Sequence, residues 1–243
     1  MKSVIITGAD RGLGLSLCKE YLSRGYTVFA GKILEEYSLL EDLREKDGNL
    51  HIISLDVTCR DSIIKARDVV SAFTGGKLDV FISNAALMGG GGLCRLYEAP
   101  MDMDFVWNTF SVNALGPVRM VELFLPLMDE SNIKRLCFVS SEVSCINLMK
   151  NRAESNGYAY PMSKSAMNMA VRLMHNQLYE RGYTFRLFHP GWMKHVLPDG
   201  SRREGAMYDP DFVALRAVKY FETPLRDEQR LVMYDFKGLE WPF

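Results

Sequence analysis

Short apolar runs alternate with longer stretches of helical period along almost the whole chain, and this order limits the fold more than any other feature. The runs are nearly continuous in apolar residues, which is typical of strands covered on both faces. The alternation predicts the α/β class, with a doubly wound parallel sheet of about seven strands and helices on both faces. No linker or internal repeat divides residues 1–243, so we expect a single domain. The expected strands are Ser3–Thr7, Thr27–Gly31, Leu50–Val57, Leu78–Asn84, Lys134–Ser140, Thr184–His189 and Arg230–Asp235, and the expected helices include Leu13–Ser23, Ser62–Phe73, Phe105–Met128 and Tyr160–Arg181.

Charge and cysteine content exclude several classes of protein. With 29 basic against 30 acidic side chains and a net charge of −1, the chain has no basic excess for binding nucleic acid. No segment reaches the roughly 18 apolar residues that a membrane span needs, and the first expected strand begins too early, at Ser3, to leave room for a targeting segment. The five cysteines form no C-x-x-C pair. We therefore expect buried thiols, no metal site, no membrane partner and a cytoplasmic location.

A glycine-rich turn from Thr7 to Gly14 joins the first expected strand to a helical stretch. Glycines at such a turn let the backbone approach a pyrophosphate and let the helix pack closely on the sheet. The N–H groups at the start of the helix then face the anion. Glycine spacing alone also fits an ordinary turn. Its place directly after an N-terminal strand predicts an NAD(P)-binding Rossmann domain.

The second expected strand is followed by Lys32, and no carboxylate stands there to hold the ribose hydroxyls of NAD. A cation at this point suits the 2′-phosphate of NADP, and Arg11 in the glycine-rich turn is a second candidate. We therefore predict NADP rather than NAD. In the alternative interpretation, each cation is a solvated surface group.

Tyr160 and Lys164 are four residues apart, which places a phenol and an ammonium on one helix face. A nearby cation favours the phenolate, so the pair could act as acid and base near neutral pH. Such a pair is also common on ordinary helix surfaces.

Taken together, these features resemble the short-chain dehydrogenase/reductase family, in its single-domain carbonyl-reductase-like branch. The resemblance covers nearly the whole chain, and the matching motifs follow the family's order. They are Gly8–Gly14, Asp56-Val57, Asn84-Ala85-Ala86, Asn113, Ser140-Ser141, Tyr160 with Lys164, Pro190-Gly191 and the ending Asp235–Phe243. The resemblance implies cofactor contacts from Gly8, Asp10, Arg11, Gly12, Leu13, Gly14, Lys32, Asp56, Val57, Asn84, Ala85, Ala86, Tyr160, Lys164, Pro190, Gly191 and Met193.

The resemblance also implies four catalytic roles. Tyr160 is implied to protonate the substrate oxygen as hydride arrives from the nicotinamide, and Ser141 to polarise that oxygen. Lys164 is implied to bind the nicotinamide ribose and to lower the pKa of Tyr160. Asn113 is implied to hold a water of a proton relay. Pro117 supports this last role, because it lacks the N–H that a regular helix would pair with the Asn113 carbonyl; a simple kink is the alternative.

The chain departs from the family pattern at three places. The serine and tyrosine motifs lie farther apart, so we expect a loop within residues 146–158 and keep Ser144 as a second candidate for the serine role. Ala86 stands where the family has glycine. His195 stands where the family commonly has a threonine that contacts the nicotinamide, so that contact is left unassigned.

Two long segments, residues 86–103 and 192–208, each follow a strand, at the sheet edge where ligands bind. We expect residues 192–208 to form a lid over the substrate. The lid's cations, Lys194, His195, Arg202 and Arg203, suggest a substrate with a carboxylate or phosphate, with a solvated loop as the alternative.

The expected function is an NADP-dependent oxidoreductase that transfers a hydride between the nicotinamide and a small carbonyl or alcohol substrate. One alternative is an NADP-binding redox sensor without turnover, which has no need of the Ser141, Tyr160 and Lys164 set. The other is a sugar-nucleotide epimerase or dehydratase, which the short stretch after Gly191 disfavours. The apolar helix Phe105–Met128 predicts a homodimer or homotetramer, or else a deeply buried helix in a monomer.

Overall fold

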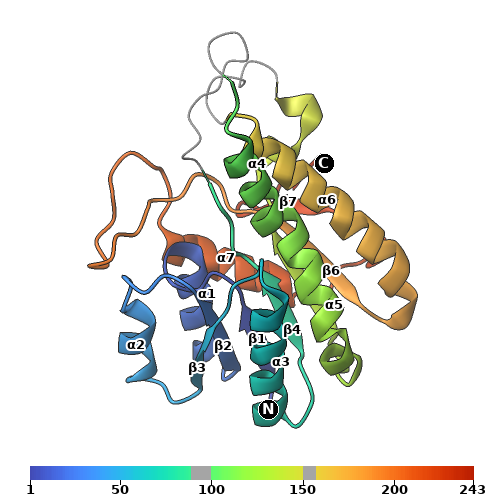
Figure 1. The fold of residues 1–243 in the computed structure, drawn as a ribbon. Coiled ribbons are helices and arrows are strands. Elements are labelled where there is room, and N and C mark those ends of the chain that lie inside the picture. The colour runs from blue at the N-terminus through green and yellow to red at the C-terminus, as the bar shows by residue number, and fades with distance from the viewer. Residues whose placement is uncertain (89–99, 150–156) are drawn as a thin grey trace.

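Within residues 1–88, 100–149 and 157–243, which the computed structural model describes, eight strands form one sheet in the order β3-β2-β1-β4-β5-β6-β7-β8 (Figure 1). Strands β1 to β7 pair in parallel, and β8 runs antiparallel to β7. The direction of winding reverses between β1 and β4, and ligands bind at such a switch point in open α/β sheets. The strands are β1 (Ser3–Ile6), β2 (Thr27–Lys32), β3 (Leu50–Ser54), β4 (Val80–Ser83), β5 (Arg135–Val139), β6 (Thr184–His189), β7 (Met233–Asp235) and β8 (Glu240–Trp241).

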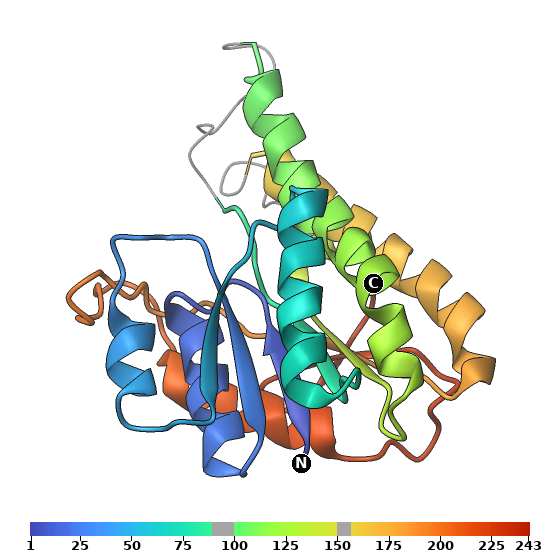
Figure 2. The same cartoon turned by 60° about the horizontal axis from the view of Figure 1, so that its bottom comes forward.

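Helices cover both faces of the sheet (Figures 1 and 2). Side chains of α3, α5 and α6 form one apolar core with the sheet, and those of α1, α2 and α7 form the other. Burial on both faces explains why the strands are continuously apolar. The helices are α1 (Gly12–Ser23), α2 (Leu39–Arg44), α3 (Arg60–Thr74), α4 (Met103–Phe110), α5 (Gly116–Asp129), α6 (Ala159–Leu178) and α7 (Pro210–Glu222).

The predicted doubly wound sheet is confirmed, with all seven expected strands present and one more, β8. The expected helix Phe105–Met128 is divided into α4, a π-helical turn at Ser111–Leu115, and α5. Pro117 explains the division, because it cannot donate the bond that would continue the α-helix.

The apolar side chains of α5 are mostly buried within the single chain, among them Met120, Phe124 and Met128. This burial accounts for the apolar character of α5 without a second subunit, whereas Trp107 and Leu115, in the rest of the expected helix, are exposed. Four of the five cysteines are described and free, three of them buried, whereas Cys94 lies outside the described residues.

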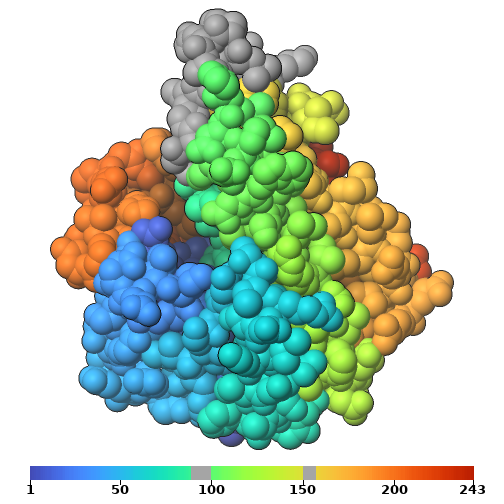
Figure 3. Space-filling model, in the orientation of Figure 1, coloured from blue at the N-terminus to red at the C-terminus, as the bar shows by residue number. Residues whose placement is uncertain are grey.

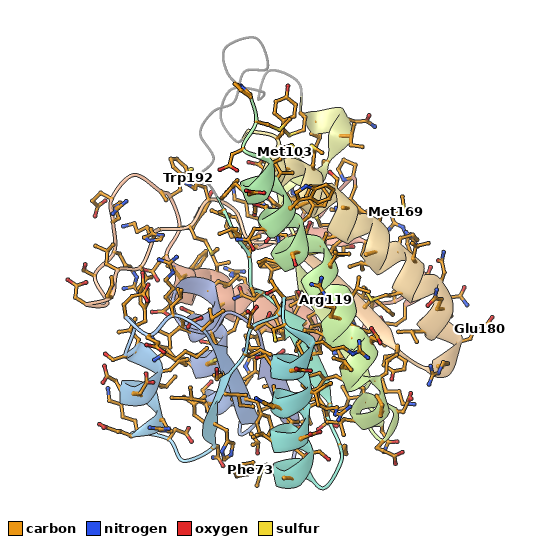
Figure 4. All side chains as sticks on the ribbon, in the orientation of Figure 1. Phe73, Met103, Arg119, Met169, Glu180 and Trp192 are labelled. Atoms are coloured by element: carbon orange, nitrogen blue, oxygen red, sulfur yellow. The ribbon has the colours of Figure 1, made fainter. Side chains whose placement is uncertain are left out.

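The carboxyl ends of the parallel strands form the upper edge of the sheet, on the side away from the N-terminus in Figure 1. The surface is hollowed there between the segment 192–208 and the blue and green parts of the chain (Figure 3). Trp192 and Met103 are both labelled near this upper edge (Figure 4). The turn after β1, the segment after β6 and the start of α6 therefore share one edge.

Candidate active site

The turn between β1 and α1 requires glycine at two positions. Gly8 has a φ of +62°, and a Cβ there would lie 2.7 Å from the Cα of Ala85. A Cβ on Gly14 would lie 2.1 Å from the carbonyl oxygen of Gly8. Helix α1 begins at Gly12 without a side-chain cap, so its first N–H groups are left for another acceptor. A pyrophosphate could therefore approach the backbone of this turn closely and accept hydrogen bonds from the first N–H groups of α1.

Asn84 holds this turn against the end of β4. Its Nδ2 donates to the carbonyl oxygens of Thr7 and Gly8, at 3.0 and 2.9 Å. Both amide hydrogens are therefore used within the protein. We assign the Asn84 side chain to positioning the turn rather than to direct contact with the cofactor.

Three other predicted cofactor residues have side chains that are already used inside the protein. Asp10 is buried, and its Oδ1 accepts from the backbone N–H groups of Ile33 and Leu34 at 2.8 and 2.7 Å. The Leu13 side chain lies in the apolar core that α1, α2 and α7 form with the sheet. Asp56 Oδ1 accepts from the backbone N–H and the hydroxyl of Thr58. Asp10 and Leu13 therefore offer a cofactor their backbone rather than their side chains, whereas the Asp56 backbone N–H already donates to the Ser62 hydroxyl and its half-buried carboxylate is the part that a cofactor could reach.

Lys32, predicted to read the 2′-phosphate, forms an ion pair with Glu41 of α2 at 2.8 Å. Its side chain is only 16% exposed. The partner carboxylate neutralises the charge that was expected to attract the phosphate, and Lys32 in turn helps to lower the pKa of Glu41. The prediction for Lys32 is therefore not supported by its surroundings.

Arg11 has different surroundings. Its Nη1 donates to the Tyr37 hydroxyl at 2.5 Å and lies 2.8 Å from Nε2 of His195. Its guanidinium carbon is 5.0 Å from the centre of the Tyr37 ring. Among the described residues, no carboxylate forms an ion pair with Arg11.

The remaining predicted cofactor residues lie at the carboxyl edge or support it. Val57 is buried, and its side chain is so close to Gly116 that a Cβ there would lie 2.9 Å from it. Ala86, which follows Ala85 after β4, is exposed. Gly191 has a φ of +75°, and Met193 forms an isolated bridge with Tyr208. Residues 190–193 therefore lead the chain from β6 into the segment 192–208.

Tyr160, Ser141 and Lys164 come together from two elements. Ser141 follows β5 directly, and Tyr160 and Lys164 lie one turn apart on α6. The Tyr160 hydroxyl is hydrogen-bonded to Ser141. The Lys164 Nζ donates to the carbonyl oxygen of Val139 at 2.8 Å and lies 5.9 Å from the centre of the Tyr160 ring. The sequence-predicted triad therefore converges at the end of β5.

Burial shifts the two titratable groups in opposite directions. It raises the pKa of Tyr160 to about 12, while the hydrogen bond to Ser141 acts the other way. It lowers the pKa of Lys164 to about 8. Burial is thus the largest influence on the pKa of Tyr160, and the lowering that Lys164 is implied to exert stays a prediction. Tyr160 is a protonated phenol at neutral pH, as a proton donor must be.

Ser144, the second candidate for the serine role, lies elsewhere. It is buried, its hydroxyl donates to the Ser141 carbonyl at 2.6 Å, and it accepts from Nδ2 of Asn168 at 2.8 Å. These hydrogen bonds stabilise the turn after β5 and join it to Asn168 of α6. Ser141 is the serine beside Tyr160.

Asn113 lies in the π-helical turn and is fully buried. Its Oδ1 accepts from Leu87 N at 2.7 Å, and its Nδ2 donates to Leu87 O and to the Ser163 hydroxyl, each at 3.0 Å. The side chain thus ties the segment after β4 to α6, next to Tyr160 and Lys164. The Pro117 ring leaves the Asn113 carbonyl without its α-helical donor.

Comparison with known proteins places this geometry in a family. Residues 2–204 match the family model for short chain dehydrogenases. The chain belongs to the short-chain dehydrogenase family. An uncharacterized oxidoreductase of Schizosaccharomyces pombe is 34% identical over 197 residues, covering 79% of this chain and 74% of that protein.

Two solved structures share the fold of this short-chain dehydrogenase. The carbonyl reductase Sniffer of Drosophila melanogaster superposes with a TM-score of 0.87 at 23% identity, covering 100% of both chains. The NADPH-bound carbonyl reductase from chicken fatty liver gives a TM-score of 0.84 at 23% identity, covering 100% of this chain and 99% of that one. Family membership makes this chain an oxidoreductase.

Two residues of this short-chain dehydrogenase were missed by sequence reasoning. Tyr37, after β2, contacts Arg11 and donates to Val196 O at 3.3 Å. His189 Nδ1 accepts from the N–H groups of Glu142 and Gly191, at 3.2 and 3.4 Å, and so joins the turns after β5 and β6. His189 could have been identified from the sequence, because it stands directly before the Pro190-Gly191 motif. No motif near Tyr37 indicates a role for that residue.

Parts of two expected loops lie outside the described residues. These are the four consecutive glycines at 89–92 and most of the extra residues before Tyr160. In the described part of the chain, no helix is long and apolar enough to span a bilayer, and no group of three potential ligands is placed to hold a metal ion.

Proposed function

We propose that the chain is an NADP-dependent oxidoreductase that transfers a hydride between the nicotinamide and a small carbonyl or alcohol substrate. The observation that carries this proposal is the convergence of Ser141, Tyr160 and Lys164 at the same sheet edge as the glycine-rich turn, with Lys164 Nζ 5.9 Å from the centre of the Tyr160 ring. A binding protein without chemistry has no need of a phenol beside a buried ammonium there.

The residues present fit the cofactor. The Gly8 and Gly14 positions have no room for a Cβ, and the uncapped start of α1 faces the same turn. Arg11 supplies a cation that no described carboxylate neutralises, which suits the additional phosphate of NADP. NADPH bound to the chicken carbonyl reductase, which has this fold, gives further support.

When bound, the cofactor supplies the hydride that is added to the carbonyl carbon. The Tyr160 hydroxyl donates its proton to the carbonyl oxygen, since its raised pKa keeps it protonated at neutral pH. The Ser141 hydroxyl, already bonded to Tyr160, orients the same oxygen. Lys164, held by Val139 O, places its charge beside the phenol and would hold the ribose of a bound cofactor. Asn113 fixes the helix that carries both, through Ser163.

We propose further that residues 192–208 form the lid over the substrate. Trp192 and Met207 are 65% and 70% exposed, which gives the segment apolar groups that a substrate could cover. The expected preference for anionic substrates loses support, because Arg202 is paired with Asp209 and Asp211 at 3.0 and 2.7 Å. Aromatic or aliphatic carbonyl compounds suit the lid better.

Oxidation of NADPH in the presence of a panel of aliphatic, aromatic and anionic carbonyl compounds tests the proposal. We expect consumption with at least one apolar compound. The variant Tyr160→Phe, which removes only the hydroxyl, serves as the matched control for non-enzymatic oxidation. Tight NADPH binding without consumption across the panel would favour the redox sensor instead.

We propose that copies of the chain associate as a homodimer or homotetramer through α6, where Met162, Met169 and Leu173 are exposed (Figure 4 labels Met169). We also propose a reducing location such as the cytoplasm, since the buried thiols of Cys18, Cys137 and Cys145 are unpaired.

A further inference from the structure

The Arg11 guanidinium is bound only by neutral partners in the described part of the chain. Its Nη1 contacts the Tyr37 hydroxyl and the His195 imidazole, and its Nε and Nη2 make no hydrogen bond to a described residue. A guanidinium has five N–H donors, so three remain for an incoming acceptor. Charge and geometry therefore favour an anion with several oxygens.

We propose that His195, with Tyr37, completes the 2′-phosphate site to which Arg11 is already assigned above, and that His195 thereby brings the segment 192–208 into this site. The inference rests on the proposed function and deepens it, because it assigns the phosphate to residues from three separate segments.

The position of the cluster matches where this phosphate must lie. Arg11 is the residue before α1, and Tyr37 follows β2. In dinucleotide-binding folds the adenosine ribose lies between the first turn and the end of the second strand. The other cation at that place, Lys32, is neutralised by Glu41 at 2.8 Å.

His195 responds to the phosphate through its protonation. The charged groups that face it are Arg11 and Arg203; its burial and these two cations lower its pKa. Neutral His195 can accept from Arg11 at 2.8 Å, but a protonated ring cannot. A phosphate dianion that binds Arg11 would replace this direct contact and favour protonated His195, which then donates to the phosphate.

This contact would also fix the segment 192–208. Tyr37 already donates to Val196 O at 3.3 Å, next to His195. A phosphate held by Arg11 and His195 would add a charged contact to this neutral one. The adenosine end of the cofactor would thereby hold the segment that we propose as the substrate lid.

Binding of NADPH and NADH to the wild type and to His195→Ala tests the inference. We expect the dissociation constant of NADPH to rise at least about tenfold, the loss of one charge-assisted hydrogen bond, and that of NADH to stay within about twofold. His195→Lys, which keeps a cation, should restore NADPH affinity to within about threefold. Lys19→Ala, which removes an exposed cation of α1 paired with Asp211, is the control for general charge effects and should leave both constants unchanged.

An unchanged ratio of NADPH to NADH affinity in His195→Ala would overturn the inference while leaving the proposed function intact. Absence of NADPH binding to the wild type would instead contradict the proposed function itself. The two failures are therefore distinguishable.

Proton uptake gives a second readout that a merely structural role would not change. Calorimetric titration at neutral pH, in buffers of different ionisation enthalpy, compares adenosine 2′,5′-bisphosphate with AMP. We expect the bisphosphate to take up more protons than AMP in the wild type, and this excess to disappear in His195→Ala and His195→Lys. Equal proton uptake with the two ligands in the wild type would show that His195 does not titrate against the phosphate.

Discussion

At the scale of single residues, the proposed chemistry depends on the Tyr160 hydroxyl. Removing it in Tyr160→Phe takes away the proton donor but leaves the ring and its packing in place. We expect turnover to fall by at least about 10²-fold, the usual contribution of a general acid. The dissociation constant of NADPH should change by no more than about threefold, because the hydroxyl faces the substrate oxygen. Turnover close to that of the wild type would remove Tyr160 from this role.

Lys164 predicts a pH dependence of stability. Burial lowers its pKa to about 8, whereas an unfolded chain keeps it near 10.4. Between these values the unfolded chain binds a proton that the folded protein has released, so the folded state gains stability as the pH rises. Relative to Lys164→Met, the free energy of unfolding of the wild type should increase by on the order of 1 kcal/mol from pH 8 to 10.

Denaturant unfolding of both proteins at several pH values measures this difference. Other titrating groups are common to the two proteins and cancel. A difference that stays constant over this range would mean that Lys164 keeps its ordinary pKa in the folded chain.

The sequence identified the residues of the candidate site better than their partners. Ser141, Tyr160 and Lys164 could be predicted because their motifs are local and ordered. The pairing of Lys32 with Glu41 and the contact of Arg11 with His195 could not, since His195 is 184 positions away and reaches Arg11 only through the fold. The choice between Ser141 and Ser144 likewise needed the structure, because it depends on which of the two serines lies beside Tyr160, whereas Ser144 is bonded to Asn168.

At the scale of elements, the π-helical turn at Ser111–Leu115 positions α6 through Asn113. Asn113→Ala would remove three hydrogen bonds, one to the Ser163 hydroxyl that is buried and two to the Leu87 backbone that are partly buried. We expect the free energy of unfolding to fall by about 2–4 kcal/mol, and turnover to fall with it. Asn108→Ala on the exposed face of α4 is the matched control and should change stability by less than about 0.5 kcal/mol.

Thermal and denaturant unfolding of the two variants decide this point. Equal stability would show that the Asn113 side chain is not needed to join the segment after β4 to α6.

The expected elements agree with the structure where the pattern is long. Seven strands were predicted from continuous apolar runs, but β8 has two residues, too few for any periodicity. The helix Phe105–Met128 was predicted as one unit, because the widened turn before Pro117 changes the hydrogen bonds and not the apolar pattern.

At the scale of the whole molecule, the glycine-rich turn and the stretch after β2 are joined to the segment 192–208 through Arg11, Tyr37 and His195. Arg203 in this segment is exposed, whereas Arg202 is paired with Asp209 and Asp211. We therefore expect limited trypsin digestion to cut after Arg203, at a rate that saturating NADPH lowers several-fold. NADH should protect less, because it lacks the 2′-phosphate. Equal cleavage rates with and without NADPH would contradict the lid proposal.

Transfer of deuterium from the C4 position of reduced NADP to a carbonyl substrate tests the central proposal most directly. The proposed function predicts one deuterium on the carbinol carbon of the product for each cofactor oxidised, read by mass spectrometry, and a strongly reduced rate in Tyr160→Phe. Oxidation of the cofactor without deuterium in the alcohol, or labelling at the same rate in Tyr160→Phe, would contradict it.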